Sequence, residues 1–129
     1  EANGGYLKLA QSLKKNKNLH GQAFNFGPNY TKNYKVLFVV KLMRKYWNKV
    51  SWKVSKKNKN NFYESNLLKL NINKAKTVLK WKGVLTFKET INMVTTWYKD
   101  YYSNHNTIYK TSFNQIKEYE KLLIKRSIK

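Results

Sequence analysis

The segment that most constrains the fold is a long amphipathic stretch that opens with a helix-capping signal. Thr86 and Glu89 stand three residues apart, the spacing of a capping box, in which two residues satisfy each other's orphan backbone N–H groups. Apolar residues then recur at intervals of 4, 3, 4 and 3 residues, close to the helical period of about 3.6 residues. These residues are Phe87, Ile91, Val94, Tyr98 and Tyr101. The pattern predicts a long α-helix with one buried side.

Four other segments carry weaker helical signals. Apolar residues at helical spacing predict helices over about residues 6–15 and 36–47, and a shorter helix over about residues 73–80. Ser112 and Gln115 repeat the capping signal, which predicts a last helix that begins there and ends in basic residues.

Short segments of alternating or apolar residues predict strands. Residues 23–26 alternate and are followed by a Gly-Pro pair that stops a strand, residues 51–54 alternate as well, and residues 67–70 form a brief third segment. We therefore expect the α/β class: an α+β-like lobe of about five helices and two or three short strands. The length suits a single domain over residues 1–129.

The charge of the chain is extreme, and it leaves two interpretations open. The formal net charge is +21, which is typical of a small basic nucleic-acid-binding protein, and we keep that as the alternative function. All basic residues except Arg44 and Arg126 are lysines, and they are spread along the chain. Arginine is the residue that favours bidentate phosphate and guanine contacts. The spread of lysines, with many Asn, Ile and Tyr, favours codon bias and only non-specific contact with nucleic acid.

The composition also excludes several kinds of site. There is no cysteine, so disulfides and thiolate metal sites are ruled out. His20 and His105 have no metal-ligating partner at a suitable spacing, so we expect no bound metal. No apolar run approaches the roughly 20 residues of a membrane span, so we expect a cytoplasmic protein without membrane contact.

A series of short phrases in fixed order carries a family resemblance. The phrases are AFNFGPN at 23–29, Glu64, LKLNINKAK at 68–76, Leu79, WK at 81–82, WYK at 97–99 and QIKEY at 115–119. The order resembles the C-terminal third of CDP-glucose 4,6-dehydratases, which are extended short-chain dehydrogenases/reductases of the NAD-dependent epimerase/dehydratase superfamily. The resemblance runs from Glu1 to about Tyr119. It implies a lyase of nucleotide-sugar and O-antigen biosynthesis, with this chain as its substrate-binding lobe.

The resemblance points to four substrate-binding residues. Asn25 and Gly27 belong to a phrase that lies near the nucleotide end of the sugar nucleotide in the family; Asn offers a donor and an acceptor, and Gly allows close approach. Asn61 and Glu64 belong to a loop that contacts the diphosphate and base in relatives. The structural alternatives are that Asn25 and Gly27 are turn residues, and that the loop is a solvated surface segment.

Two phrases of the resemblance are structural. Residues 70–76 resemble Leu-Asp-x-Ser-Lys-Ala, with Asn71 at the Asp and Asn73 at the Ser, and both are acceptable helix caps. Residues 79–83 resemble Leu-Gly-Trp-x-Pro, with Lys80 at the Gly, which normally follows a helix because it tolerates positive φ. Lysine at that position is expected to cost about 1 kcal/mol.

The resemblance implies NAD, but these residues contain no motif that would hold it. The family oxidises the sugar at C4, eliminates water across C5–C6 and returns the hydride to C6. That chemistry needs a Gly-rich turn and a Tyr-x-x-x-Lys pair, and neither occurs here. We therefore expect a C-terminal fragment without the Rossmann domain, catalytic residues or bound cofactor, and inactive alone. Its expected partners are a CDP-sugar and a separate Rossmann-domain half, with a homodimer in the complete family enzyme.

Overall fold

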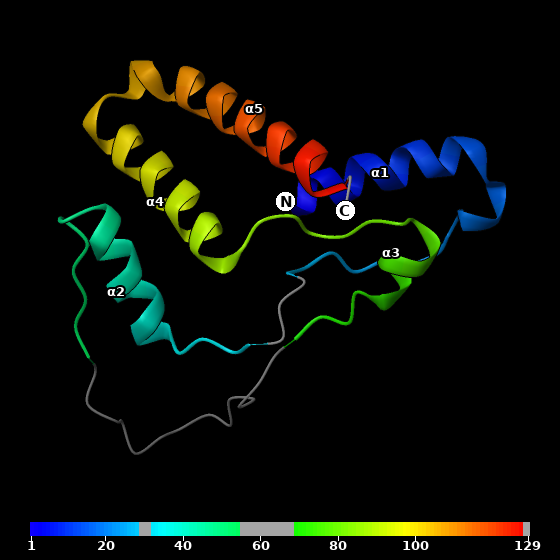
Figure 1. Cartoon of the computed structure of the whole chain (residues 1–129), viewed down its shortest axis with the longest axis horizontal. Coiled ribbons are helices and arrows are strands. Elements are labelled where there is room, and N and C mark those ends of the chain that lie inside the picture. Colours follow the sequence, from blue (N-terminus) through cyan, green and yellow to red (C-terminus); the bar gives the residue numbers. More distant parts are fainter. Residues whose placement is uncertain (29–31, 55–68, 128–129) are drawn as a thin grey trace. The chain divides into compact units, whose positions relative to one another are not determined.

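Helices are the regular structure of this protein. Figure 1 shows the computed structural model, which describes residues 1–28, 32–54 and 69–127. The described α-helices are α1 (Ala2–Lys15), α2 (Val36–Tyr46), α3 (Asn73–Val78), α4 (Phe87–Ser103) and α5 (Ile108–Ser127), and the short 3-10 helices are η1 (Lys17–Leu19) and η2 (His105–Thr107). The helices predicted from apolar spacing are therefore present.

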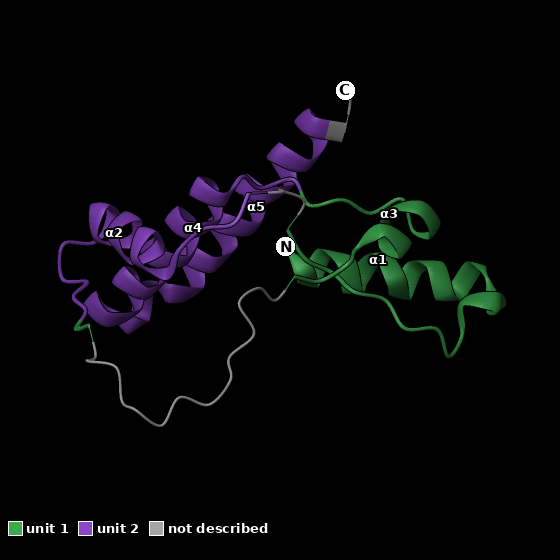
Figure 2. Ribbon diagram, turned by 90° about the horizontal axis from the view of Figure 1, so that it is seen from below, with its two compact units in different colours: residues 1–29, 53–83 green, residues 30–52, 84–129 purple. Residues whose placement is uncertain are grey.

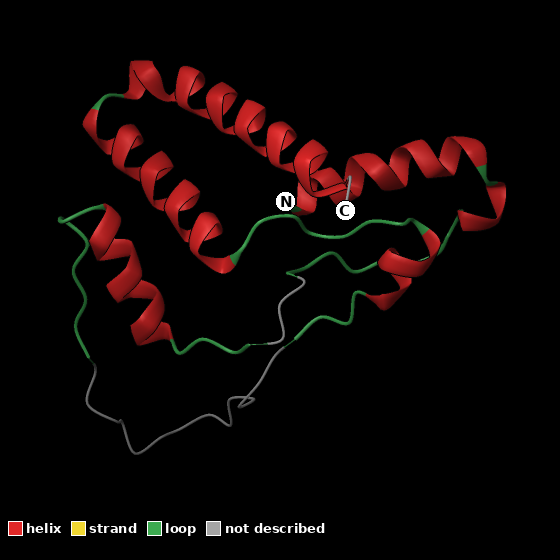
Figure 3. Ribbon diagram, viewed as in Figure 1, coloured by secondary structure: helices red, strands yellow, loops and turns green. Residues whose placement is uncertain are grey.

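The predicted α/β class is wrong. In the described residues the chain forms five α-helices with loops between them and no strand (Figure 3). A strand is held by backbone hydrogen bonds to a neighbouring strand. Residues 23–26 and 51–54 have no such backbone partner within the described ranges, so alternation alone does not make them strands. The third predicted segment, 67–70, lies partly outside the described residues.

The described residues group into two compact units (Figure 2). Unit 1 comprises residues 1–29 and 53–83, and unit 2 comprises residues 30–52 and 84–129. Each unit has its own helices, since α1 and α3 belong to unit 1 and the other three α-helices belong to unit 2.

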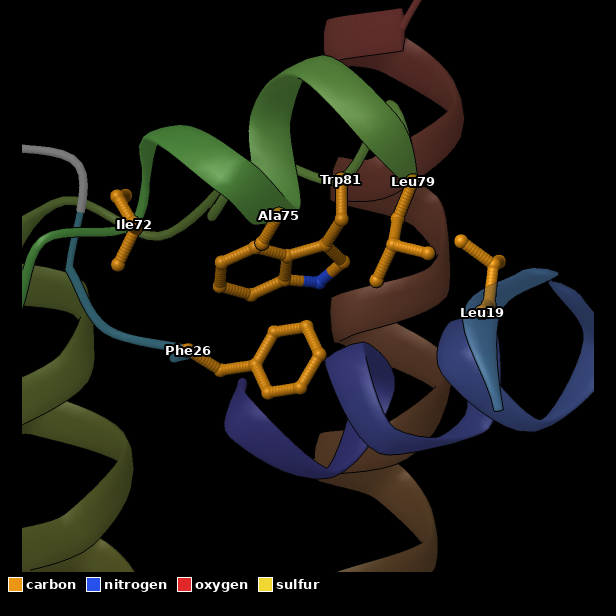
Figure 4. Packing of buried hydrophobic residues seen from close by; sticks show 6 residues of the cluster. All are labelled: Leu19, Phe26, Ile72, Ala75, Leu79 and Trp81. Atoms are coloured by element: carbon orange, nitrogen blue, oxygen red, sulfur yellow. The ribbon is translucent and has the colours of Figure 1, made fainter. Parts of the chain in front are cut away.

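Unit 1 is built around a buried apolar cluster. Ala75 of α3 and Leu79, which directly follows α3, are almost completely buried, with exposed fractions of 0% and 2%. The ring of Phe26 lies edge-on to Trp81, with centroids 5.0 Å apart, and edge-on to Tyr6 at 5.3 Å. Leu19 and Ile72 complete the buried cluster (Figure 4).

Gly5 explains how closely α1 approaches this cluster. The residue is buried, and a Cβ placed on it would collide with the Phe26 ring. Only glycine at this point of the helix lets the aromatic ring lie directly against the backbone.

In unit 2, helices α2 and α5 both pack against α4. Polar side chains join α4 to α5: Trp97 Nε1 donates to Ser112 Oγ at 2.9 Å, and Gln115 Nε2 donates to the Met93 carbonyl at 2.8 Å. The predicted capping role of Ser112 and Gln115 is therefore wrong. Helix α5 begins at Ile108, and both side chains point from within the helix to α4.

Aromatic rings join α2 to α4. The Tyr34 ring, just before α2, stacks on Phe87 with centroids 3.7 Å apart, and Trp47 stacks with Tyr102 at 5.8 Å. Only Val84 and Thr95 are deeply buried among the described residues of unit 2. Unit 2 therefore depends on half-buried rings and polar contacts between helices.

Candidate functional site

The Asn25–Gly27 phrase lies on an irregular segment of unit 1 that the core holds in place. Phe26 is buried, and the half-buried ring of Phe24 packs against the same cluster. Lys74 Nζ lies 4.7 Å from the centroid of the Phe24 ring, a cation–π contact. Because Phe24 and Phe26 point to the core, the residue between them is exposed.

That exposed residue is Asn25. Its Nδ2 donates a long hydrogen bond of 3.4 Å to the Asn71 carbonyl, which joins the segment to the residues just before α3. Hydrogen bonds at this distance are weak. The side chain of Asn25 can therefore exchange this partner for a ligand at small cost, and its Oδ1 remains an additional acceptor.

Gly27 is half-buried beside Leu70 and Ile72. A Cβ on Gly27 would lie 3.5 Å from Ile72 Cγ2 and 3.6 Å from Leu70 Cβ, which are ordinary van der Waals contacts. The protein around Gly27 therefore does not itself require glycine. Gly27 differs in this respect from Gly5, where the Phe26 ring leaves no room for a side chain.

Asn71 also belongs to this surface. The predicted capping of α3 by Asn71 or Asn73 is wrong, because Ile72 is the N-cap residue, without a side-chain cap bond, and Asn73 is the first residue of the helix. The Asn71 carbonyl accepts from Asn25, while its Oδ1 accepts from the Asn73 backbone N–H at 2.9 Å. The second bond satisfies an orphan donor at the start of α3. No local pattern in the sequence indicates the first bond, because Asn25 and Asn71 are 46 positions apart.

The structure describes only half of the predicted site. Asn25 and Gly27 lie on one segment of unit 1, next to the residues that precede α3. Asn61 and Glu64 lie outside the described residues. The predicted substrate surface is consequently defined here by Asn25, Gly27 and their neighbour Asn71.

The strongest electrostatic contact is in unit 2 and is structural. Arg126 binds Glu89 through two nitrogens, at 2.9 Å to Oε2 and 2.7 Å to Oε1, and Arg126 also donates to the Val84 carbonyl. Hydrogen bonds from Arg126 and from the Thr86 backbone and hydroxyl lower the pKa of Glu89 from 4.5 to about 2. A carboxylate with this pKa stays ionised and is a poor general acid or base near neutral pH.

Two further kinds of function find no support in the part of the chain that the structure describes. No three His, Asp or Glu side chains there are grouped so that they would hold a metal ion. None of the helices in the described ranges has both the length and the apolar character needed to cross a membrane.

Comparison of this chain with protein-family models, with curated proteins and with solved structures finds no match. The resemblance to CDP-glucose 4,6-dehydratases therefore rests on the phrases quoted above. The function that follows from it is a proposal.

Proposed function

We propose that this chain is the C-terminal substrate-binding part of a CDP-glucose 4,6-dehydratase and that Asn25 and Gly27 of unit 1 contact the nucleotide. In this function the chain binds and orients CDP-glucose. NAD supplies the redox chemistry of the family and belongs to a Rossmann-domain half, because these residues contain no Gly-rich turn for it.

The observation that carries the proposal is the backbone of Lys80. Lys80 has φ +52°, the one positive φ among the described non-glycine residues. It directly follows Leu79, the C-cap residue of α3. The family phrase Leu-Gly-Trp-x-Pro has glycine at this position, and glycine adopts positive φ without strain. Lys80 thus has a backbone conformation that suits the glycine of the family phrase, which supports the alignment although the residue here is lysine.

The start of α3 supports the same alignment. The family phrase Leu-Asp-x-Ser-Lys-Ala has Asp where this chain has Asn71. Asn71 precedes the N-cap residue Ile72, and its Oδ1 accepts the backbone N–H of Asn73, a local bond that an Asp side chain at this position can also make. This bond and the positive φ of Lys80 support the alignment at the two ends of α3.

The Asn25–Gly27 segment offers suitable chemistry for a nucleotide. Asn25 is exposed and presents a donor and an acceptor, as recognition of a base or ribose requires. Nothing in unit 1 requires Gly27 to lack a side chain. A close approach of ligand to the backbone at Gly27 would account for its identity.

The fold class counts against the proposal. The family resemblance implies a lobe of helices and short strands, and the described residues contain helices only. The support comes instead from the two ends of α3 and from the Asn25–Gly27 segment, all of which belong to unit 1.

Titration of the purified chain with CDP-glucose, followed by the amide resonances of NMR, tests the proposal. We expect shifts at Asn25, Gly27 and Asn71, with a dissociation constant of about 1 mM, as suits a surface with few polar contacts. The Asn25→Ala variant should bind about tenfold more weakly, since it removes a charge-neutral donor and acceptor. Asn18→Ala, an exposed asparagine of the same unit, is the matched control.

Gly27→Ala sharpens the test. The added Cβ has room in unit 1, so the variant should fold as the parent does and yet lose affinity. If CDP-glucose causes no shifts in unit 1, or if Asn25→Ala and Asn18→Ala bind alike, the proposal fails.

A complementation assay examines the dehydratase itself. We expect the chain alone to form no 4-keto-6-deoxy product from CDP-glucose and NAD. We expect product when the Rossmann-domain half of a CDP-glucose 4,6-dehydratase is supplied as well. If the chain alone formed this product, the interpretation that it needs a separate Rossmann-domain half would be wrong.

A further inference from the structure

Helix α5 of unit 2 presents three different faces. One face packs on α4 through Ser112 and Gln115, and through Arg126 near its end. A helix turns by about 100° per residue, so the neighbouring residues Tyr109 and Lys110 lie on two further faces. The face that contains Tyr109 is apolar, and the face that contains Lys110 is basic.

The apolar face is exposed. Tyr109, Phe113, Ile116 and Leu123 follow one another at intervals of 4, 3 and 7 residues, with Glu120 at the intervening position. Their exposed fractions are 81%, 46%, 57% and 39%. Alternating steps of 4 and 3 residues are the pattern of a seam that packs against another helix. We call these five residues the α5 seam.

Two contacts involve the aromatic side chains of the α5 seam along its first turns. The rings of Tyr109 and Phe113 are stacked, with an interplanar angle of 6° and centroids 6.4 Å apart. Lys117 Nζ lies 4.5 Å from the centroid of the Phe113 ring. The aromatic part of the seam is thus bordered directly by a cation.

Lysines form the basic face beside the seam. Lys110 and Lys117 each follow a seam residue by one position, and Lys121 follows Glu120. At such flanking positions charged side chains select the partner helix by complementary charge. The flank of this helix therefore requires acidic residues opposite it.

A second copy of the chain does not meet that requirement. Each copy carries a net charge of +21, and pairing two α5 seams would place lysine flanks close to one another. Nor does an anionic membrane surface suit the seam, because the exposed carboxylate of Glu120 lies in the middle of the apolar face. A helix with acidic flanks and a cation opposite Glu120 satisfies both features.

We propose that the α5 seam is a docking surface for an amphipathic helix of a partner protein whose flanking positions are acidic. The apolar seam supplies the contact area, and the lysine flank supplies selectivity. This surface is on unit 2, so the proposal is independent of the nucleotide-binding role proposed for unit 1.

A synthetic probe tests the proposal with the full chain. The probe is a dye-labelled helical peptide with Leu at seam positions, Lys opposite Glu120 and Glu on both flanks; a second peptide has Lys on the flanks. Anisotropy is measured at about 0.3 M salt, where the Debye length is short and distant charges are screened. We expect the Glu peptide to bind and the Lys peptide to bind far more weakly.

Paired variants locate the binding surface. Ile116→Glu should weaken binding of the Glu peptide about tenfold, whereas Val36→Glu, an exposed apolar residue of α2, should leave it within about twofold. Lys117→Glu should weaken the Glu peptide and strengthen the Lys peptide. Lys45→Glu, the same charge change on α2, should do neither. Circular dichroism checks that each variant keeps its helix content.

Three outcomes would overturn the proposal. The first is that a seam variant and its α2 control lose peptide binding equally, either Ile116→Glu with Val36→Glu or Lys117→Glu with Lys45→Glu. That result would mean that the acidic peptide binds the basic chain by general charge attraction. The second is an Ile116-dependent dimer in analytical ultracentrifugation, which would make a second copy the occupant. The third is Ile116-dependent binding to phosphatidylserine vesicles without binding to the Glu peptide.

Discussion

Unit 1 is held together by a buried apolar cluster, whereas unit 2 is held together by side-chain hydrogen bonds and half-buried rings between helices. In unit 1, Ala75 of the short helix α3 and Leu79 directly after it are almost completely buried. In unit 2, the long helices α4 and α5 are joined by hydrogen bonds such as Trp97–Ser112 and by the Arg126–Glu89 ion pair.

The difference shows that helix length does not decide where a chain buries its apolar surface. Helix α3 spans six residues, yet Ala75 within it and Leu79 directly after it are two of the most buried side chains, whereas α5 spans twenty residues and leaves an apolar seam exposed. Unit 1 should therefore respond most to loss of apolar volume, and unit 2 to loss of charge.

The largest effect should come from truncating the core of unit 1. Leu79→Ala removes apolar volume from a side chain that is 2% exposed and should destabilise unit 1 by about 3 kcal/mol. Hydrogen exchange should show faster exchange of the α1 and α3 amides, with the α4 amides unchanged. Val78→Ala, at a neighbouring exposed position, should cost less than about 1 kcal/mol. If Leu79→Ala increased amide exchange equally in both units, the idea that only unit 1 depends on this apolar cluster would be wrong.

A smaller effect should appear in unit 2 on acidification. The folded pKa of Glu89 is about 2, below its ordinary 4.5, so the unfolded chain binds the proton more readily. The stability that Glu89 contributes is present above pH 4.5 and is lost as the pH falls towards 2. We expect about 1 kcal/mol, since both side chains of the pair are about a third exposed and solvent screens them.

Urea unfolding of unit 2, followed by its NMR resonances at several pH values, measures this loss. Glu89→Gln should flatten the pH dependence, because glutamine keeps the capping-box geometry but carries no charge. Glu118→Gln, on an exposed part of α5, should leave the slope unchanged. A slope that survives Glu89→Gln would assign the acid sensitivity to another carboxylate.

The smallest effect should be a gain of stability in unit 1. Lys80→Gly relieves the strain of the positive φ after α3 and should stabilise unit 1 by about 0.5–1 kcal/mol. This is a net value, because glycine also raises the conformational entropy of the unfolded chain, which offsets part of the gain. Lys82→Gly, at a position without positive φ, should destabilise slightly. The two variants are compared by the urea midpoint of unit 1 resonances, and no difference between them would mean that Lys80 stores no strain.

Local signals in the sequence predicted the helices well. The capping box of Thr86 and Glu89 is present at the start of α4, with the Thr86 N–H 2.7 Å from Glu89 Oε2. The positive φ expected at Lys80 is present too. Both features depend on residues close together in the chain, so spacing alone is enough to indicate them.

Non-local contacts account for the errors. Residues 23–26 and 51–54 alternate as strands do, but alternation describes which side chains are buried and does not provide a backbone partner. Ser112 and Gln115 have the spacing of a cap, yet Trp97 and the Met93 carbonyl bind their side chains from α4. Propensity yields to tertiary contacts in both cases.

The candidate site shows the same division. The sequence indicated Asn25 and Gly27 through a family phrase, and the structure places them on a segment held by Phe26. The Asn25–Asn71 bond was not predictable, since nothing in either neighbourhood specifies a partner 46 residues away. Asn61 and Glu64 lie outside the described residues and stay predictions.

The amino-acid sequence by itself determined the basic character of the chain, which is a matter of composition. It also determined the helices, the N-terminal cap of α4 and the strained turn at Lys80, because each of these depends on neighbours within about one or two helical turns. Only the tertiary structure decided that the alternating segments remain unpaired, that Phe26 lies between Tyr6 and Trp81, and that Arg126 binds Glu89 across 37 positions. Those contacts join residues whose separation along the chain carries no periodic signal, so packing selects them.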